Sequence, residues 1–128
     1  MINIVVAIGK NREIGKRNGL LWHIPEDAKH FRELTTSHPV IMGRKTFESL
    51  PDKFRPLPNR TNIVITRESG FNIPGVVTAR SIDDALAEAK RSINSDEIFI
   101  IGGSQVYTST LPLVDRLYIT IVDAHFPE

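Results

Sequence analysis

Two short motifs in the chain combine glycine with groups that bind anions. The first, Gly43-Arg44-Lys45-Thr46, follows an apolar run and opens a stretch of helical character. Glycine allows a ligand close to the backbone, and the N–H groups of a helix start, two cations and a hydroxyl can all contact a phosphate. A solvated helix start with ordinary basic residues would look the same. The motif alone therefore predicts either a phosphate-binding turn or an exposed helix terminus.

The second motif is the sequence IGGSQ at residues 101–105, which also follows an apolar run. Its paired glycines would let the backbone approach a pyrophosphate or a flat ring, although it is not GxGxxG and a tight turn without a ligand fits equally well. In open α/β sheets, ligands bind at the carboxyl ends of strands, where both motifs are expected. Together with Arg67 after a third strand, they favour a dinucleotide over a polynucleotide, which needs a wider basic surface.

A carboxylate and an aromatic ring share one face of a predicted helix over residues 25–36. Asp27, Phe31 and Leu34 fall at i, i+4 and i+7. A partly buried carboxylate there would recognise an amidine-like or guanidine-like edge by paired hydrogen bonds. The alternative is an exposed first-turn Asp that stabilises the helix dipole. Trp22, the only Trp, precedes this helix as either a core anchor or the wall of a ligand pocket.

Other routes to catalysis have no support in the sequence. There is no Cys, and His23, His30, His38 and His125 lack metal-like spacing, so neither thiolate nor metal chemistry is predicted. The hydroxyl residues form no nucleophile elbow. Chemistry without a nucleophile or a metal points to a redox cofactor.

Length and composition describe one ordinary globular domain. The chain has 128 residues, 41% of them hydrophobic and 24% charged, with a net charge of +1. These values exclude a disordered chain, and the balanced charge argues against nucleic acid or a membrane as a partner. No apolar run is long enough to cross a bilayer and no signal peptide is visible, which favours the cytoplasm.

The elements that must position these residues alternate between β-branched runs and amphipathic stretches, the pattern of an α/β fold. We expect a mixed, mainly parallel central sheet flanked by helices, with strands at residues 2–9, 39–43, 61–66, 76–79, 97–101 and 116–124. Besides the helix over 25–36, a short one is expected at 44–50 and another after Gly103. A further helix is expected after Ser81, which resembles a cap, with Ala85, Leu86, Ala89 and Ile93 as its apolar stripe.

Combined, these motifs closely resemble those of bacterial dihydrofolate reductases, in register from Met1 to about Phe126. The resemblance is carried by Ile14-Gly15, Asn18, Leu20, Trp22, Ile24-Pro25-Glu26-Asp27, Phe31, PVIMGRKTFES at 39–49, Leu57-Pro58-Asn59-Arg60 and Ile101-Gly102-Gly103. It implies an NADPH-dependent reduction of dihydrofolate to tetrahydrofolate. The expected partner is thus a small molecule, with no nucleic acid or membrane involved.

The resemblance also implies roles for individual residues. Asp27 would bond the pterin, Trp22 would hold a water near it, and Thr120 would bridge to Asp27, with Leu20 completing the catalytic set. Arg60 would clamp the glutamate α-carboxylate of the substrate as a bidentate pair. The implied substrate contacts are Val6, Asp27, Phe31, Arg60, Ile101 and Thr120. The implied NADPH contacts are Ala7, Ile14, Gly15, Gly43, Arg44, Lys45, Thr46, Thr66, Arg67, Gly102, Gly103, Ser104, Gln105 and Tyr107.

The chain departs from the family pattern at its end. Family members continue beyond the last predicted strand with two further strands, so residues 1–128 are expected to form a single domain that is short at its C-terminus. We expect a monomer whose exposed last strand can self-associate. Two alternatives stay open: a noncatalytic nucleotide-binding module, and a pyrimidine-deaminoreductase-like domain of riboflavin synthesis. The combination of Trp22, Asp27, Phe31 and Arg60 argues against the second.

Overall fold

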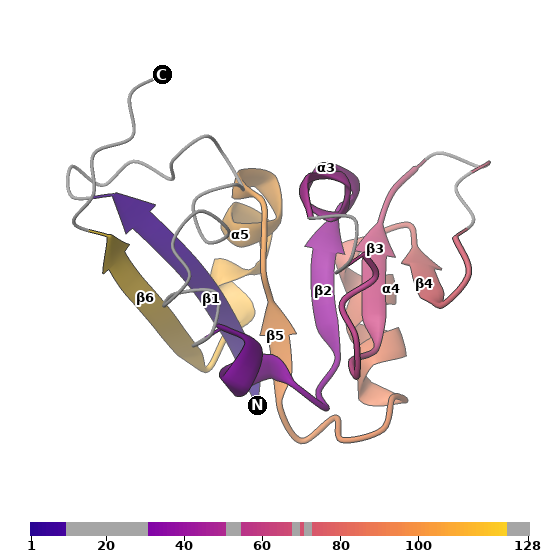
Figure 1. The fold of residues 1–128 in the computed structure, drawn as a ribbon, viewed down its shortest axis with the longest axis horizontal. Helices are drawn as coiled ribbons and strands as arrows, with labels where there is room; N and C mark the ends of the chain where they lie inside the picture. Colours follow the sequence, from indigo (N-terminus) through magenta and orange to yellow (C-terminus); the bar gives the residue numbers. More distant parts are fainter. Residues whose placement is uncertain (10–30, 51–54, 68–69, 71–72, 123–128) are drawn as a thin grey trace.

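A six-stranded sheet forms the centre of the molecule (Figure 1). The structure, a computed structural model, describes residues 1–9, 31–50, 55–67, 70 and 73–122. Strand order is β4-β3-β2-β5-β1-β6, and every pair among the described strands is parallel. The strands are β1 (Ile2–Gly9), β2 (Val40–Gly43), β3 (Asn62–Ile65), β4 (Val76–Ala79), β5 (Ile98–Ile100) and β6 (Arg116–Val122).

The six predicted strands are confirmed, with ends that differ by at most two residues. The last two residues of the predicted strand 116–124 lie outside the described part of the chain. Of the predicted helix over 25–36, residues 31–35 are helical and residue 36 is a turn, whereas 25–30 also lie outside it. All parallel strands point their carboxyl ends to the same edge, so this edge is where the two glycine motifs must be sought.

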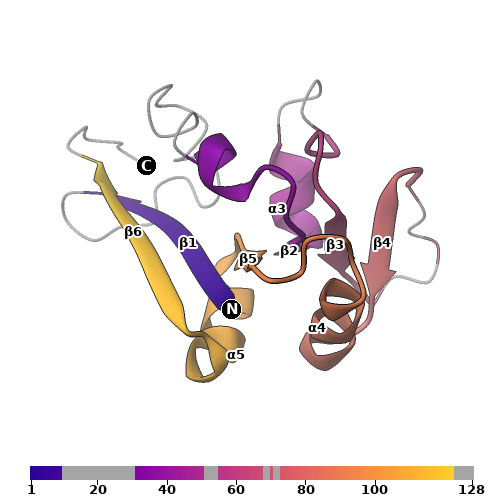
Figure 2. The ribbon, with the colours of Figure 1, turned by 90° about the horizontal axis from the view of Figure 1, so that it is seen from below.

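Helices cover both faces of the sheet (Figure 2). On one face lie α4 (Ile82–Lys90) and α5 (Ser104–Thr110), which continues into the short 3-10 helix η3 (Leu111–Leu113). On the other lie α3 (Arg44–Ser49) and the helical residues 31–35. Among the described residues, no helix has the length and apolar character needed to cross a membrane.

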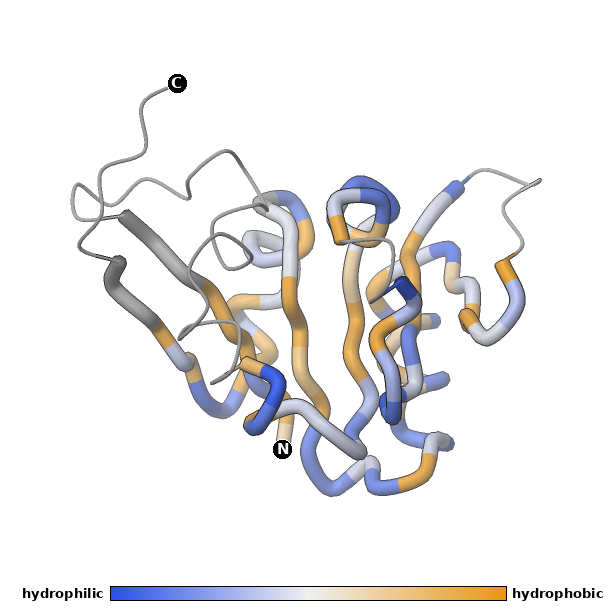
Figure 3. Tube along the Cα trace, in the orientation of Figure 1, coloured by the Kyte–Doolittle hydropathy of each residue, from blue (hydrophilic) through white to orange (hydrophobic). Residues whose placement is uncertain are grey.

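The central strands bury both of their faces. In β2, Val40 and Met42 pack on the side of α3, and Ile41 packs on the side of α4, because successive side chains of a strand point to opposite faces. All three are at most 1% exposed. Apolar residues accordingly colour the central strands in Figure 3. The prediction of strands without a solvated face is confirmed for these strands.

Helix α4 confirms one local prediction and corrects another. The Ser81 side chain accepts a hydrogen bond from the Asp84 amide at 3.1 Å, so Ser81 is the predicted cap. Ala85, Leu86 and Ala89 are buried as expected, but Ile93 is 80% exposed. Including Ile93 in the apolar stripe was wrong, because the helix ends at Lys90 and Ile93 no longer lies on its face.

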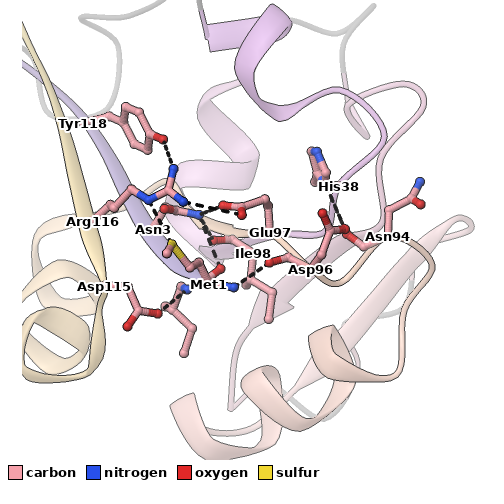
Figure 4. Close-up of polar contacts among 11 residues, drawn as sticks. Met1, Asn3, His38, Asn94, Asp96, Glu97, Ile98, Asp115, Arg116 and Tyr118 are labelled. Carbon is pink, nitrogen blue, oxygen red and sulfur yellow. Dashed lines mark hydrogen bonds and ion pairs between the residues drawn. The ribbon is translucent and has the colours of Figure 1, made fainter.

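Polar contacts tie together the amino ends of β1, β5 and β6 (Figure 4). Buried Asn3 donates to the Glu97 carboxylate at 2.9 Å and to the carbonyl of Ile98 at 3.1 Å. The amide of Ile2 donates to the Asp115 carboxylate at 2.8 Å. This network holds the edge of the sheet opposite to the one that carries the glycine motifs.

Candidate active site

The two glycine motifs meet at the carboxyl edge of the sheet. Strands β2 and β5 are neighbours, and each is followed by one of the motifs and then by a helix, α3 or α5. The amide of Gly43 donates a hydrogen bond to the carbonyl of Gly102 at 2.8 Å. The peptide bond between Gly102 and Gly103 is cis, and Gly102 has a φ of 130°, which favours glycine. Two motifs that are far apart in the sequence are therefore in direct contact and can contribute to a single binding site.

The structure around Gly43 has space for a larger side chain than the hydrogen atom of glycine. Its φ of −78° and ψ of 165° suit any residue. A Cβ added there would meet the Val106 side chain at 3.5 Å, an ordinary contact. Neither the backbone conformation nor packing against the described residues therefore demands glycine at this position, whereas a ligand lying against the backbone would.

Thr46 carries a buried hydroxyl at the start of α3. The residue is 3% exposed, and its Oγ1 has no hydrogen bond among the described residues. Leaving a buried polar group unpaired costs on the order of 1–3 kcal/mol. The first turns of α3 and α5 have no side-chain cap either. These polar groups at one edge fit the phosphates of a nucleotide cofactor.

The predicted cations lie beside this edge. Arg44 donates twice to the Glu48 carboxylate, at 3.0 and 3.1 Å. Lys45 and Arg67 are exposed, and Thr66 is buried at the end of β3 with its amide on the carbonyl of Ala79. Arg44 is therefore already paired with Glu48, and a phosphate would have to compete with that carboxylate for Arg44.

On the face of the sheet that carries α3, a buried apolar group contains the predicted substrate contacts Phe31 and Ile101, at 1% and 4% exposed. Val6 is not brought together with them, since its side chain packs on the opposite face with α4 and α5. Val5 and Leu57 pack with Phe31 instead; Leu57 belongs to the family motif that contains Arg60, but neither residue was predicted as a substrate contact. The alternation along β1 separates Val5 from Val6, but only the packing shows which of them faces Phe31.

Arg60 lies over this apolar group. Its guanidinium carbon is 5.9 Å from the centre of the Phe31 ring. Its Nε donates to the carbonyl of Pro58 and its Nη1 to the hydroxyl of Thr35, both at 2.9 Å. Burial, together with the nearby charge of Arg32, lowers the pKa of Arg60 to about 10. Arg60 is therefore still a cation at neutral pH, held beside an apolar surface.

The loop that carries Arg60 is fastened by Asn62 of β3. The side chain of Asn62, 1% exposed, accepts from the amide of Leu57 and donates to the carbonyls of Leu57 and Arg60, at 2.9, 2.9 and 3.1 Å. A buried amide with its hydrogen bonds made keeps one loop geometry. Neither Asn62 nor Thr35 was expected from the sequence, because their partners become visible only once the chain is folded.

Tyr107 of α5 reaches the first strand. Its hydroxyl donates to the carbonyl of Val5 at 2.8 Å, and burial raises the pKa of Tyr107 above its ordinary value. The phenol therefore stays protonated at neutral pH and keeps this hydrogen bond. Through it, the helix of the second glycine motif is tied to the strand that packs against Phe31.

The remaining predicted residues fall into two groups. Ser104 opens α5, Gln105 is exposed on it, and Ala7 of β1 pairs in register with Thr120 of β6. Outside the described residues lie Ile14, Gly15, Leu20, Trp22 and Asp27. Within the described ranges, no three His, Cys, Asp or Glu side chains gather as metal ligands.

Similarity to known proteins extends over the whole chain. The family model described as dihydrofolate reductase matches residues 1–128. The chain is 43% identical to dihydrofolate reductase type 3 of Salmonella typhimurium, with 100% of the chain and 79% of that protein aligned. It is 44% identical to dihydrofolate reductase of Bacillus subtilis, of which it covers 76%.

A solved structure of dihydrofolate reductase from Enterococcus faecalis, complexed with NADP(H) and RAB-propyl, superposes with a TM-score of 0.86 at 36% identity. The superposition covers 99% of this chain and 73% of that one. Matches of this extent include both glycine motifs and the Arg60 loop. The chain belongs to the dihydrofolate reductase family.

Proposed function

We propose that the chain catalyses the NADPH-dependent reduction of 7,8-dihydrofolate to 5,6,7,8-tetrahydrofolate, a reaction that supports one-carbon metabolism. The observation that carries the proposal is the hydrogen bond between Gly43 and Gly102 at the carboxyl ends of two neighbouring strands, in a sheet whose face bears Phe31 and Arg60. Thr46 of the helix that follows Gly43 adds a buried hydroxyl with no hydrogen-bond partner among the described residues. This arrangement suits a nucleotide and a flat ring with an anionic tail.

The cofactor half of the site would bind phosphates through the carboxyl ends of β2, β3 and β5. Gly43, Thr46 and Gly102 line its centre, and Arg44, Lys45 and Arg67 are the cations available to the 2′-phosphate. When bound, NADPH supplies a hydride to the imine carbon of the pterin. The chain itself holds the two rings at a reactive distance and excludes water. The further contacts proposed are Ala7, Ile14, Gly15, Thr66, Gly103, Ser104, Gln105 and Tyr107.

The substrate half would bind and protonate the pterin. Asp27 is proposed to accept hydrogen bonds from a ring nitrogen and the 2-amino group, which favours the protonated imine. One hydride and one proton add across the C=N bond, and the cofactor leaves in its oxidised form. Trp22, Leu20 and Thr120 would support Asp27, while Phe31 and Ile101 pack against the substrate and Arg60 binds its carboxylate.

Replacing Thr46 with Val should weaken NADPH binding without lowering the free energy of unfolding of the cofactor-free protein. We expect NADPH affinity to fall about tenfold, since a hydrogen bond to a charged phosphate is lost, while the free energy of unfolding without cofactor is unchanged or rises by up to about 1 kcal/mol. The reason is that the buried hydroxyl has no partner among the described residues. Fluorescence titration and urea denaturation measure the two quantities. T46S keeps the hydroxyl and serves as the control; an equal loss of affinity in T46S would count against this role.

Replacing Glu48 with Gln should raise the preference for NADPH over NADH. Arg44 and Glu48 form an ion pair at 3.0 Å with both side chains partly exposed, so its release is worth only a few tenths of a kcal/mol. We expect the ratio of NADPH to NADH affinities to rise about twofold, because only NADPH carries the 2′-phosphate. An unchanged ratio would argue that Arg44 does not meet that phosphate.

The proposed reaction is tested by mixing the purified chain with NADPH and dihydrofolate and following cofactor absorbance. Oxidation that needs dihydrofolate and is abolished in Asp27→Asn supports the enzyme. Cofactor binding without turnover would instead identify a nucleotide-binding module. The cytoplasmic location, the single-domain organisation and the monomeric state remain predictions.

A further inference from the structure

Thr35 forms hydrogen bonds with both Phe31 and Arg60, two of the residues proposed to contact the substrate. It is completely buried at the end of the helical residues 31–35. Its hydroxyl donates to the carbonyl of Phe31 at 2.9 Å and accepts from Nη1 of Arg60 at 2.9 Å. A guanidinium can only donate, and a hydroxyl has a single proton, so the direction of both hydrogen bonds is fixed. Thr35 therefore links the position of Phe31 to that of Arg60.

The two hydrogen bonds that Arg60 forms with described residues leave one edge of its guanidinium without a partner in that part of the chain. Of the five N–H groups of an arginine, Nε uses one on Pro58 and Nη1 uses one on Thr35. The remaining N–H groups, on Nη1 and Nη2, can form the paired hydrogen bonds that a carboxylate accepts. Among the described residues, no carboxylate forms an ion pair with Arg60.

Without Thr35, the hydrogen bond from Nε to the carbonyl of Pro58 would be the one side-chain hydrogen bond that Arg60 keeps within the described part of the chain, and one bond orients a guanidinium less well than two. Arg60 is partly buried, and the nearby charge of Arg32 repels it. Its backbone is fixed by Asn62, but its side chain has several rotatable bonds between the backbone and the charge. A buried acceptor is what offsets the cost of holding this cation away from water.

We infer that Thr35 is a positioning residue that aims the remaining N–H groups of Arg60 and thereby makes the chain select dihydropterins that carry a carboxylate tail. This inference rests on the proposed function. It assigns to Thr35 a role in substrate selection that acts entirely through Arg60, rather than through contact with the reacting atoms.

The test compares two substrates in T35V and T35S. One is dihydrofolate; the other is 6-methyl-7,8-dihydropterin, which lacks the carboxylate tail. We expect T35V to lower kcat/KM for dihydrofolate about tenfold, chiefly through KM, and so to lower the ratio of kcat/KM between the two substrates by a similar factor. T35S, which keeps the hydroxyl, should restore this ratio to within about twofold.

A double-mutant cycle with Arg60→Lys checks the route of the effect. If Thr35 acts through Arg60, T35V should change the substrate ratio by less than about twofold in the R60K background. Thermal denaturation verifies folding, and T35A, which also lacks the hydroxyl, replaces T35V if the latter does not fold.

Three results would overturn the inference. Equal losses of kcat/KM on both substrates would identify a merely structural role, and full additivity with R60K would exclude action through Arg60. An unchanged kcat/KM for dihydrofolate in T35V would refute it while the wild-type chain still reduces dihydrofolate. Wild-type protein that reduces neither substrate would instead refute the proposed function itself.

Discussion

Asp27→Asn is expected to lower kcat for dihydrofolate on the order of 100-fold at neutral pH, the range that general acid–base groups contribute. The amide keeps the size of the side chain and removes its charge, so the protonated imine loses the anion that favours it. NADPH binding should be unchanged, because the glycine motifs that would hold its phosphates lie at the carboxyl ends of β2 and β5. Steady-state turnover and cofactor titration measure the two effects.

The pH dependence of Asp27→Asn sharpens this prediction. As the pH falls, protons from solution protonate more of the imine, so the turnover of the variant should rise toward that of the wild type. Asp27→Glu keeps the charge at a shifted position and is expected to retain more activity than Asp27→Asn at neutral pH. Unchanged turnover in Asp27→Asn would contradict the role given to Asp27.

Arg60→Lys is expected to raise KM for dihydrofolate by a factor of about 10 to 100 with a smaller effect on kcat. Lys keeps the charge but cannot present two parallel N–H groups to a carboxylate, and hydrogen bonds to charged groups are worth about 1.5–3 kcal/mol. Lys also cannot reproduce the two hydrogen bonds that now orient the guanidinium toward Pro58 and Thr35. Initial rates over a range of dihydrofolate concentrations measure the change.

A matched control accompanies Arg60→Lys. Arg91→Lys makes the same change just after α4, where Arg91 pairs with Glu88 at the surface, and should leave KM within about twofold.

In the wild type, the pKa of about 10 for Arg60 means that the cation is present below that pH and lost above it. Dihydrofolate affinity should therefore stay level through neutral pH and fall as the pH rises through 10. A KM for dihydrofolate in R60K equal to that of the wild type would contradict the proposal that Arg60 binds the substrate.

Much of the fold follows from local patterns in the sequence. Runs of β-branched residues predict all six strands because a strand buried on both faces needs apolar side chains in succession. Ser81 predicts the start of α4 because its hydroxyl can satisfy a free amide of the first turn. The error at Ile93 shows the limit: an apolar residue at the right spacing does not reveal that the helix has already ended.

The site could be predicted only in parts. Each glycine motif alone is compatible with an ordinary turn, and its meaning changes once β2 and β5 are adjacent and Gly43 bonds to Gly102. The sequence predicted Val6 beside Phe31, whereas the structure places Val5 there. Alternation along a strand shows which residues share a face, but it does not show which face packs against which helix.

The sequence by itself determines the family, the residues available for chemistry and the approximate limits of the elements, because these depend on residue type and short-range spacing. Only the tertiary structure decides which of these residues meet. The hydrogen bond from Arg60 to Thr35 joins positions 25 residues apart, and no local preference encodes it. Such contacts arise from strand order and packing, and they convert a list of anion-binding and apolar residues into a site with one geometry.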